Sequence, residues 1–131
     1  MITIDTSVIL AMALHEPEAD ELLRREAALI GWPPLLETRM VLTGKGFQNA
    51  AAIIDQLVDL PNITAIAFDQ AHYRAAEQAF DRFGKGRHPA SLNMGDCYSY
   101  AVASVSKAPL LFKGQDFGQT DLKLHHESST L

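Results

Sequence analysis

The sequence predicts an α/β fold, a three-layer α/β/α sandwich in which helices cover both faces of a mostly parallel central sheet. The predicted strands are short and apolar, and a helical pattern separates each strand from the next. The chain of 131 residues contains no internal repeat, low-complexity tract or linker-like stretch. This length suffices for one domain with a substantial core and is too short for two, so we expect residues 1–131 to form a single domain.

The first half of the chain is expected to form two strands and four helices. The first strand is expected to end at Asp5, and the second covers residues 29–30. The first helix follows Thr6 or Ser7 and runs to about Leu14, and the other helices cover residues 17–27, 34–44 and 47–60. Thr6 or Ser7 is the expected cap of the first helix, and Pro17 begins the second. Gly44 ends the third helix and Pro61 stops the fourth. Leu36, Met40 and Glu37 are expected on the inner face of the third helix.

The second half predicts strands over residues 63–68 and 110–112, a final edge strand over residues 122–124, and two helices. Asp69 is expected to cap the first of these helices, in which His72 and Phe80 share an apolar stripe. His72 is therefore interpreted as a residue at the edge of the core and not as a metal ligand. Asn93 is expected to cap the second helix, and the tail from His125 is predicted to be loose.

Net charge, cysteine content and hydropathy limit the partners and the cellular compartment that this protein can have. The formal charge of −5, from 11 basic and 16 acidic residues, implies no general surface for polyanions, so a nucleic-acid role needs a local basic patch or bound cations. The single cysteine, Cys97, excludes an internal disulfide framework and fits a reducing compartment. The apolar run Val8–Leu14 is too short to cross a bilayer and no basic segment precedes it. We expect a cytoplasmic protein without a membrane anchor.

Four acidic residues stand where an element ends or turns inward. Asp5 follows the first strand, Asp116 follows the strand at 110–112, Asp96 lies in the first turn of the helix capped by Asn93, and Glu37 lies near a helix start. Ligands of open α/β sheets bind beyond the carboxyl ends of the strands. If the strands before Asp5 and Asp116 are neighbours, these carboxylates converge.

Carboxylates that share one cleft repel each other, and hard divalent cations relieve that repulsion. All-oxygen sites suit Mg²⁺ or Mn²⁺, which can hold the oxygens of a phosphodiester. Four basic residues are candidates for phosphate contacts around such a site: Lys45, Lys85, Arg87 and Lys113. The alternative for the Lys85–His88 loop is an ordinary solvated surface, and the alternative for Asp96 is a residue that only completes the helix cap.

Three other functions compete with a nuclease. A receiver-type phosphorylation switch would use Asp69 together with Lys113, but it leaves Glu37 and Asp96 without a role. An aspartyl-phosphate hydrolase of the Asp-x-Asp type needs a second acid where this chain has Ser7. A catalytically silent binding protein would keep the fold and lose the chemistry.

Four motifs together resemble one family. They are Ile-Asp-Thr-Ser at 4–7, Leu-Leu-Glu-Thr at 35–38, Leu-Asn-Met-Gly-Asp-Cys at 92–97 and Leu-Leu-Phe-Lys-Gly-Gln-Asp-Phe at 110–117. The set resembles the PIN-domain ribonucleases, in particular the VapC toxins of toxin–antitoxin pairs. The resemblance implies a single PIN domain, a Mg²⁺- or Mn²⁺-dependent endoribonuclease aimed at tRNA or other structured RNA, a VapB-type antitoxin that blocks the site, and a toxin homodimer.

The resemblance also implies a role for each matching residue. Asp5 and Asp96 would be the main metal ligands, and Glu37 and Asp116 would orient water or hold a second ion. Ser7 and Asn93 would support the ligands, and Asp121 ranks at best as a supporting residue. Metal-activated water would attack the scissile phosphorus in line and leave a 5′-phosphate. Apolar residues on the early helices are candidates for the antitoxin surface: Met12, Leu14, Leu22, Trp32 and Met40.

Overall fold

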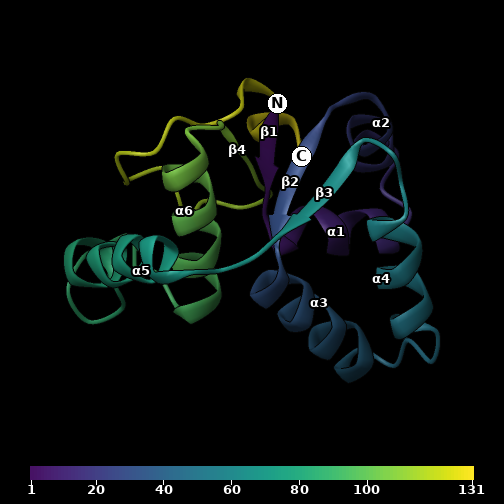
Figure 1. Ribbon diagram of the computed structural model, residues 1–131, viewed down its shortest axis with the longest axis horizontal. Coiled ribbons are helices and arrows are strands. Elements are labelled where there is room, and N and C mark those ends of the chain that lie inside the picture. Colours follow the sequence, from purple (N-terminus) through teal and green to yellow (C-terminus); the bar gives the residue numbers. More distant parts are fainter.

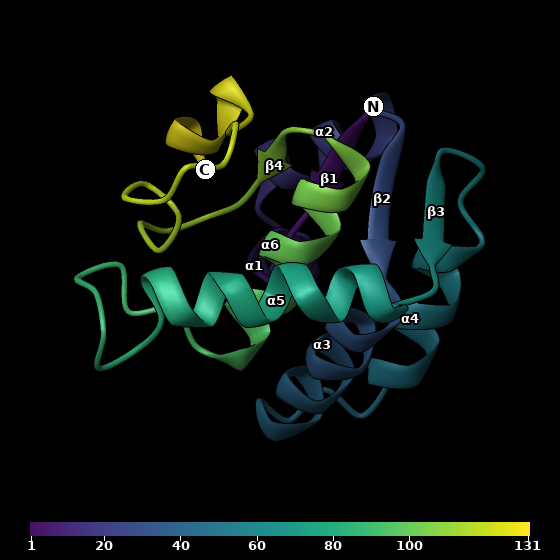
Figure 2. The ribbon, with the colours of Figure 1, turned by 60° about the vertical axis from the view of Figure 1, so that its left-hand side comes forward.

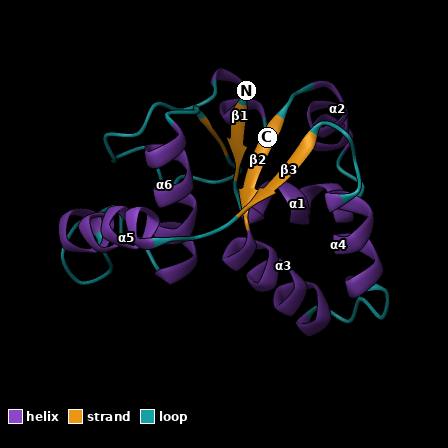
Figure 3. Ribbon diagram, in the orientation of Figure 1, coloured by secondary structure: helices purple, strands orange, loops and turns teal.

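A four-stranded parallel sheet forms the centre of the protein, in a computed structural model that describes residues 1–131 apart from the side chain of Thr130. The strand order is β3-β2-β1-β4, so β1 pairs with both β2 and β4. The elements in chain order are β1 (Ile2–Ile4), α1 (Thr6–Ala13), α2 (Pro17–Arg25), β2 (Ala28–Gly31), α3 (Trp32–Gly44), α4 (Ala50–Val58), β3 (Ile63–Ile66), α5 (Gln70–Phe83), α6 (Met94–Ser106), β4 (Leu110–Leu111) and the 3₁₀-helix η1 (His126–Thr130). Figure 3 shows that β1, β2 and β3 point toward the start of α3.

Helices cover both faces of the sheet, which confirms the predicted three-layer α/β/α sandwich (Figure 1). On one face, side chains of β1 and β2 meet α1 to α4 in a core that includes Ile4, Ile9 and Leu42. On the other face, α6 packs on β1 and β2, and α5 runs across α6 (Figure 2). Leu110 and Phe83 belong to this second core. The alternation of Leu110 and Leu111 between the two cores follows from the two-residue period of a strand.

The start of α1 differs from the prediction in a way that matters for the site. Asp5, and not Thr6 or Ser7, is the N-cap, because its extended backbone brings its carboxylate to the backbone N–H of Ser7 at 3.1 Å. Thr6 lies inside the helix, and its hydroxyl donates a hydrogen bond to Oε1 of Glu37 on the neighbouring α3 at 3.0 Å.

Three other expectations about helices need correction. Leu36 and Met40 are 61% and 64% exposed, because the inward positions of α3 are Leu35, Thr38 and Leu42. The helix α4 begins at Ala50 and not at residue 47, since residues 45–49 form a turn in which Gly46 has a φ of +92°. Phe80 is 43% exposed, although the other predicted members of its stripe are at least partly buried.

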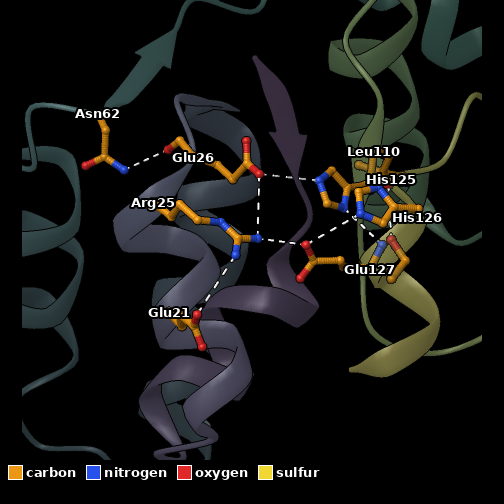
Figure 4. Close-up of polar contacts among 9 residues, drawn as sticks. Glu21, Arg25, Glu26, Asn62, Leu110, His125, His126 and Glu127 are labelled. Carbon is orange, nitrogen blue, oxygen red and sulfur yellow. Dashed lines mark hydrogen bonds and ion pairs between the residues drawn. The ribbon is translucent and has the colours of Figure 1, made fainter.

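The C-terminal segment was predicted to be loose and is instead attached to the sheet (Figure 4). Glu127 forms an ion pair of 2.7 Å with Arg25 of α2. The hydroxyl of Ser128 accepts a hydrogen bond from the backbone N–H of Phe112 at 3.2 Å and lies 3.3 Å from the carbonyl oxygen of Leu110. Residues 122–124 form no strand, because only one bridge, between Leu110 and Leu124, joins them to β4. These contacts cover the outer edge of β4.

None of the helices in the described part of the chain has the length and apolar character needed to cross a membrane.

Candidate active site

Asp5 is held in place by hydroxyl groups from two helices. Its Oδ2 accepts hydrogen bonds from the backbone N–H and the hydroxyl of Ser7, at 3.1 and 2.7 Å. Its Oδ1 accepts a hydrogen bond from the hydroxyl of Ser99, which lies on α6. Both Asp5 and Ser99 are buried. The first strand and the helix that covers it are thus joined through one carboxylate, whose orientation is fixed.

Asp96 occupies the first turn of α6 and completes a capping box. Its backbone N–H donates to the side-chain oxygen of Asn93 at 2.8 Å, and its Oδ2 accepts from the backbone N–H of Asn93 at 3.1 Å. Asp96 is only 8% exposed. Asn93 therefore caps the helix as predicted and also holds the carboxylate of Asp96.

The charge environment of Asp96 shows that other acids lie close to it. Burial is the main cause that raises the pKa of Asp96 to about 7, against the lowering effect of its hydrogen bond with Asn93. The negative charges of Asp116 and Asp5 raise the pKa further. Asp116 itself is exposed, on the loop after β4, and the buried ring of Phe117 anchors that loop.

Glu37 reaches the same site from α3. Its Oε1 accepts a hydrogen bond from the hydroxyl of Thr6 at 3.0 Å, and Thr6 in turn accepts one from Thr38. Its carboxylate lies so close to Gly95 of α6 that a methyl group on Gly95 would overlap it. Burial raises the pKa of Glu37, the Thr6 hydroxyl opposes that rise, and the charge of Asp5 adds to it. The predicted acid on α3 therefore does point inward.

Ser7 connects Asp5 to the loop that carries Asp116. Its hydroxyl donates to Asp5 and accepts from the backbone N–H of Lys113 at 2.9 Å. The side chain of Lys113 turns away and pairs with Glu16 at 2.5 Å. A single hydroxyl thus aligns the carboxyl ends of β1 and β4, which are paired neighbours in the sheet.

The donor set suits a hard divalent cation, because each of the four acids offers only carboxylate oxygens. The raised pKa values of Asp96 and Glu37 indicate a site in which added positive charge would be favourable. Among the described residues, no three His, Cys, Asp or Glu side chains converge tightly enough to form a closed cage for an ion. Mg²⁺ commonly takes one or two carboxylates and completes its shell with water and phosphate oxygens, so it does not need such a cage.

Asp121 and Asp69, which the sequence analysis considered for functional roles, form contacts outside the acidic site. Asp121 accepts a hydrogen bond from the hydroxyl of Tyr100 at 2.5 Å and pairs with Arg82 at 3.0 Å, which ties the last loop to α5 and α6. Asp69 caps α5 and binds His72, and it follows β3 at the sheet edge, separated from β1 by β2. Asp69 therefore caps a helix at the edge of the sheet. Lys113, its expected partner in a phosphorylation switch, pairs with Glu16 instead.

Three residues of the site were missed in the sequence: Thr6, Gly95 and Ser99. Ser99 lies one helical turn after Asp96, so the spacing of 96 and 99 was the available signal. Nothing in the sequence marked Gly95, since its role depends on the approach of α3 to α6.

Comparisons with known sequences identify the family to which this fold corresponds. The family model described as "PIN domain" matches residues 2–123. "Ribonuclease VapC" of Mycolicibacterium smegmatis is 38% identical over 130 residues, which are 94% of this chain and 98% of the relative. "Ribonuclease VapC30" of Mycobacterium tuberculosis is 38% identical over 126 residues, covering 91% of this chain and 94% of the relative.

Solved structures share the fold. Mycobacterium tuberculosis VapC20, titled a toxin that cleaves the sarcin–ricin loop, superposes with a TM-score of 0.76 at 16% identity, covering 93% of this chain and 96% of the other. VapBC2 of Rickettsia felis, bound to a DNA fragment of its promoter, gives a TM-score of 0.74 at 14% identity, covering 95% and 98%.

Proposed function

The chain belongs to the PIN-domain family, and from that premise we propose that it is a divalent-metal-dependent endoribonuclease, a toxin of the VapC type. The observation that carries the proposal is the buried carboxylate of Asp96, whose pKa is raised by burial and by the charges of Asp116 and Asp5. A cluster of this kind costs stability without a cation, so its presence favours a functional site.

In this proposal Asp5 and Asp96 hold Mg²⁺ or Mn²⁺. The ion supplies positive charge for the scissile phosphate and lowers the pKa of water in the site. Ser7 and Ser99 keep the carboxylate of Asp5 oriented, and Asn93 does the same for Asp96. Glu37 and Asp116 complete the acidic set and orient water, with Thr6 fixing Oε1 of Glu37.

The relatives support an RNA substrate. The curated relatives are named ribonucleases, and one structural neighbour is described as a Sarcin-Ricin loop cleaving toxin. We infer an RNA substrate, with tRNA the first candidate, and a cytoplasmic location that suits the single cysteine.

Two surfaces that expose apolar side chains are assigned to protein partners. A groove of about 410 Å³ between α1, α2 and α4 is lined by Met12, Phe47 and Ile53, and we assign it to a helix of a VapB-type antitoxin. Leu22, which was a candidate for this surface, is buried in the core. Trp32 and Met40, which were candidates for the antitoxin surface, form an exposed stripe with Leu36 on α3. We assign this stripe instead to a second copy of this chain, and a Met40→Glu variant should sediment as a monomer.

The test of the nuclease is cleavage of purified tRNA with Mg²⁺ or Mn²⁺, with a chelator, and with no addition. We expect cleavage only with the metal, products that carry a 5′-phosphate, and loss of cleavage in Asp5→Asn and Asp96→Asn. Asp81→Asn, which neutralises an exposed acid on α5, is the matched control. Cleavage that persists in the chelator would refute the metal requirement. A metal-loaded protein that cuts no RNA while binding its antitoxin would favour the silent binding protein.

A further inference from the structure

A pocket of about 530 Å³ lies between α5 and α6, outside the set of acids described above. Aromatic rings from both helices line it. Tyr73 and Phe80 are seven residues apart and share one face of α5, and Met94 and Tyr98 are four apart on α6. Phe68, which precedes α5, closes one end with its ring centroid 5.3 Å from that of Tyr98, edge to face. Tyr73, Phe80 and Met94 are more than 40% exposed, at 52%, 43% and 71%.

The pocket adjoins the acidic site through Asn93. Asn93 lines the pocket and is also the residue whose backbone N–H binds Oδ2 of Asp96 at 3.1 Å. A flat group seated in the pocket would therefore touch the residue that holds the carboxylate of Asp96. The two sites are neighbours, so one strand of a nucleic acid could occupy both.

Positive charge lies beside the rings of the pocket. Lys85 lines it, and the guanidinium of Arg87 lies 4.6 Å from the ring centroid of Phe80. Both side chains come from the loop after α5 and are exposed. The one acidic lining residue, Glu77, accepts a hydrogen bond from Tyr73 at 2.9 Å and pairs with Arg74 at 3.4 Å. The chain as a whole carries −5, so this basic rim is local.

We propose that the pocket between α5 and α6 receives an unpaired nucleobase of the RNA substrate, next to the phosphate that lies at Asp5 and Asp96. The inference rests on the proposed nuclease function and adds to it a preference for single-stranded loops. Bases of single-stranded RNA stack on exposed aromatic rings, and lysine and arginine beside the rings contact the backbone. A base in a duplex cannot enter, so cleavage should be confined to loops, bulges and ends.

The experiment uses an RNA hairpin with one loop base replaced by 2-aminopurine, whose fluorescence is quenched when it stacks on an aromatic ring. The full chain carries Asp5→Asn so that the RNA stays intact. We expect quenching on binding, and about tenfold weaker binding without quenching when Phe80→Ala is added. Phe80→Trp should restore both. Val105→Ala, which shortens a 39% exposed residue toward the end of α6, is the matched control and should bind like the parent.

The outcomes separate this inference from the nuclease proposal. Equal binding and equal quenching with and without Phe80→Ala would overturn the nucleobase pocket, even if the native chain cuts RNA. A Phe80→Ala variant that loses a dimer in sedimentation, with unchanged RNA binding, would assign the pocket to a second copy and also overturn it. If Phe80→Ala abolishes quenching but the native chain cuts no RNA, the pocket stands and the nuclease proposal fails.

Discussion

The carboxylate of Glu37 lies directly against Gly95, so that a methyl group on Gly95 would overlap Oε2 of Glu37. Glu37 belongs to α3 and Gly95 to the first turn of α6. The absence of a side chain on α6 therefore creates the space that a carboxylate from α3 occupies. This contact brings the third acid to the helix that carries Asp96.

Gly95→Ala should impair the site without unfolding the protein. The added methyl group meets the far end of a flexible side chain, so Glu37 rotates away while the backbone stays in place. We expect RNA cleavage to fall about 100-fold, since a displacement of about 1 Å has effects of that size, with an unchanged melting temperature. Gly44→Ala is the control, because a Cβ there meets nothing within 4 Å. Full activity in Gly95→Ala would remove Glu37 from the mechanism.

Asp96→Asn should stabilise the protein at neutral and alkaline pH in a chelator. The pKa of Asp96 is raised from 3.8 to about 7, so the folded protein keeps a proton that the unfolded chain releases between these values. Stability therefore falls as the pH rises through this range. Asparagine keeps the capping box without the charge, and we expect a gain of about 1–3 kcal/mol above pH 7 that vanishes below pH 4.

Urea denaturation of Asp96→Asn and the native chain across this pH range measures the difference. Mg²⁺ in place of the chelator should stabilise the native chain more than the variant, because the variant lacks one of the two proposed carboxylate ligands. A constant difference between the two proteins at every pH would contradict the raised pKa.

Ser128→Ala should destabilise the protein by about 1–3 kcal/mol, because it leaves the buried N–H of Phe112 without its acceptor. The hydroxyl of Ser128 also lies 3.3 Å from the carbonyl oxygen of Leu110, at the outer edge of β4. Ser129→Ala removes an exposed hydroxyl one residue later and should change stability little. Thermal unfolding followed by circular dichroism compares the two. Equal melting temperatures would mean that the C-terminal segment is not needed for the sheet.

Asp121→Asn separates a supporting role at the metal from a structural one. Burial raises the pKa of Asp121, but hydrogen bonds from Tyr100 and Arg82 outweigh it and lower the pKa overall. This contribution to stability is present above the ordinary pKa and is lost as the pH falls through the lowered value. The Arg82 pair is exposed, so we expect a loss of only about 1 kcal/mol at pH 7.

The same variant should leave Mg²⁺ affinity, measured by calorimetry, unchanged. Tyr100→Phe should reproduce the loss of stability, because it removes the shorter of the two contacts. A weaker affinity for the metal in Asp121→Asn would instead place Asp121 among the residues that support the ligands.

Local signals in the sequence determined much of the fold. Asn93 and Asp69 were identified as caps because their short polar side chains suit that position, and Pro61 separated α4 from β3. The inward direction of Glu37 was also predicted, although its apolar neighbours Leu36 and Met40 turned out to be exposed. Helix periodicity over one turn does not distinguish a face that meets the sheet from a face left for a partner.

Local patterns thus predict the order of the four strands and six helices along the chain and the four acids near the ends of elements. They do not predict that Ser99 holds Asp5, that Gly95 makes room for Glu37, or that Ser128 binds the edge of β4. These three contacts join residues far apart in the chain. Whether their side chains meet depends on how the helices pack on the sheet, and no local pattern records that packing.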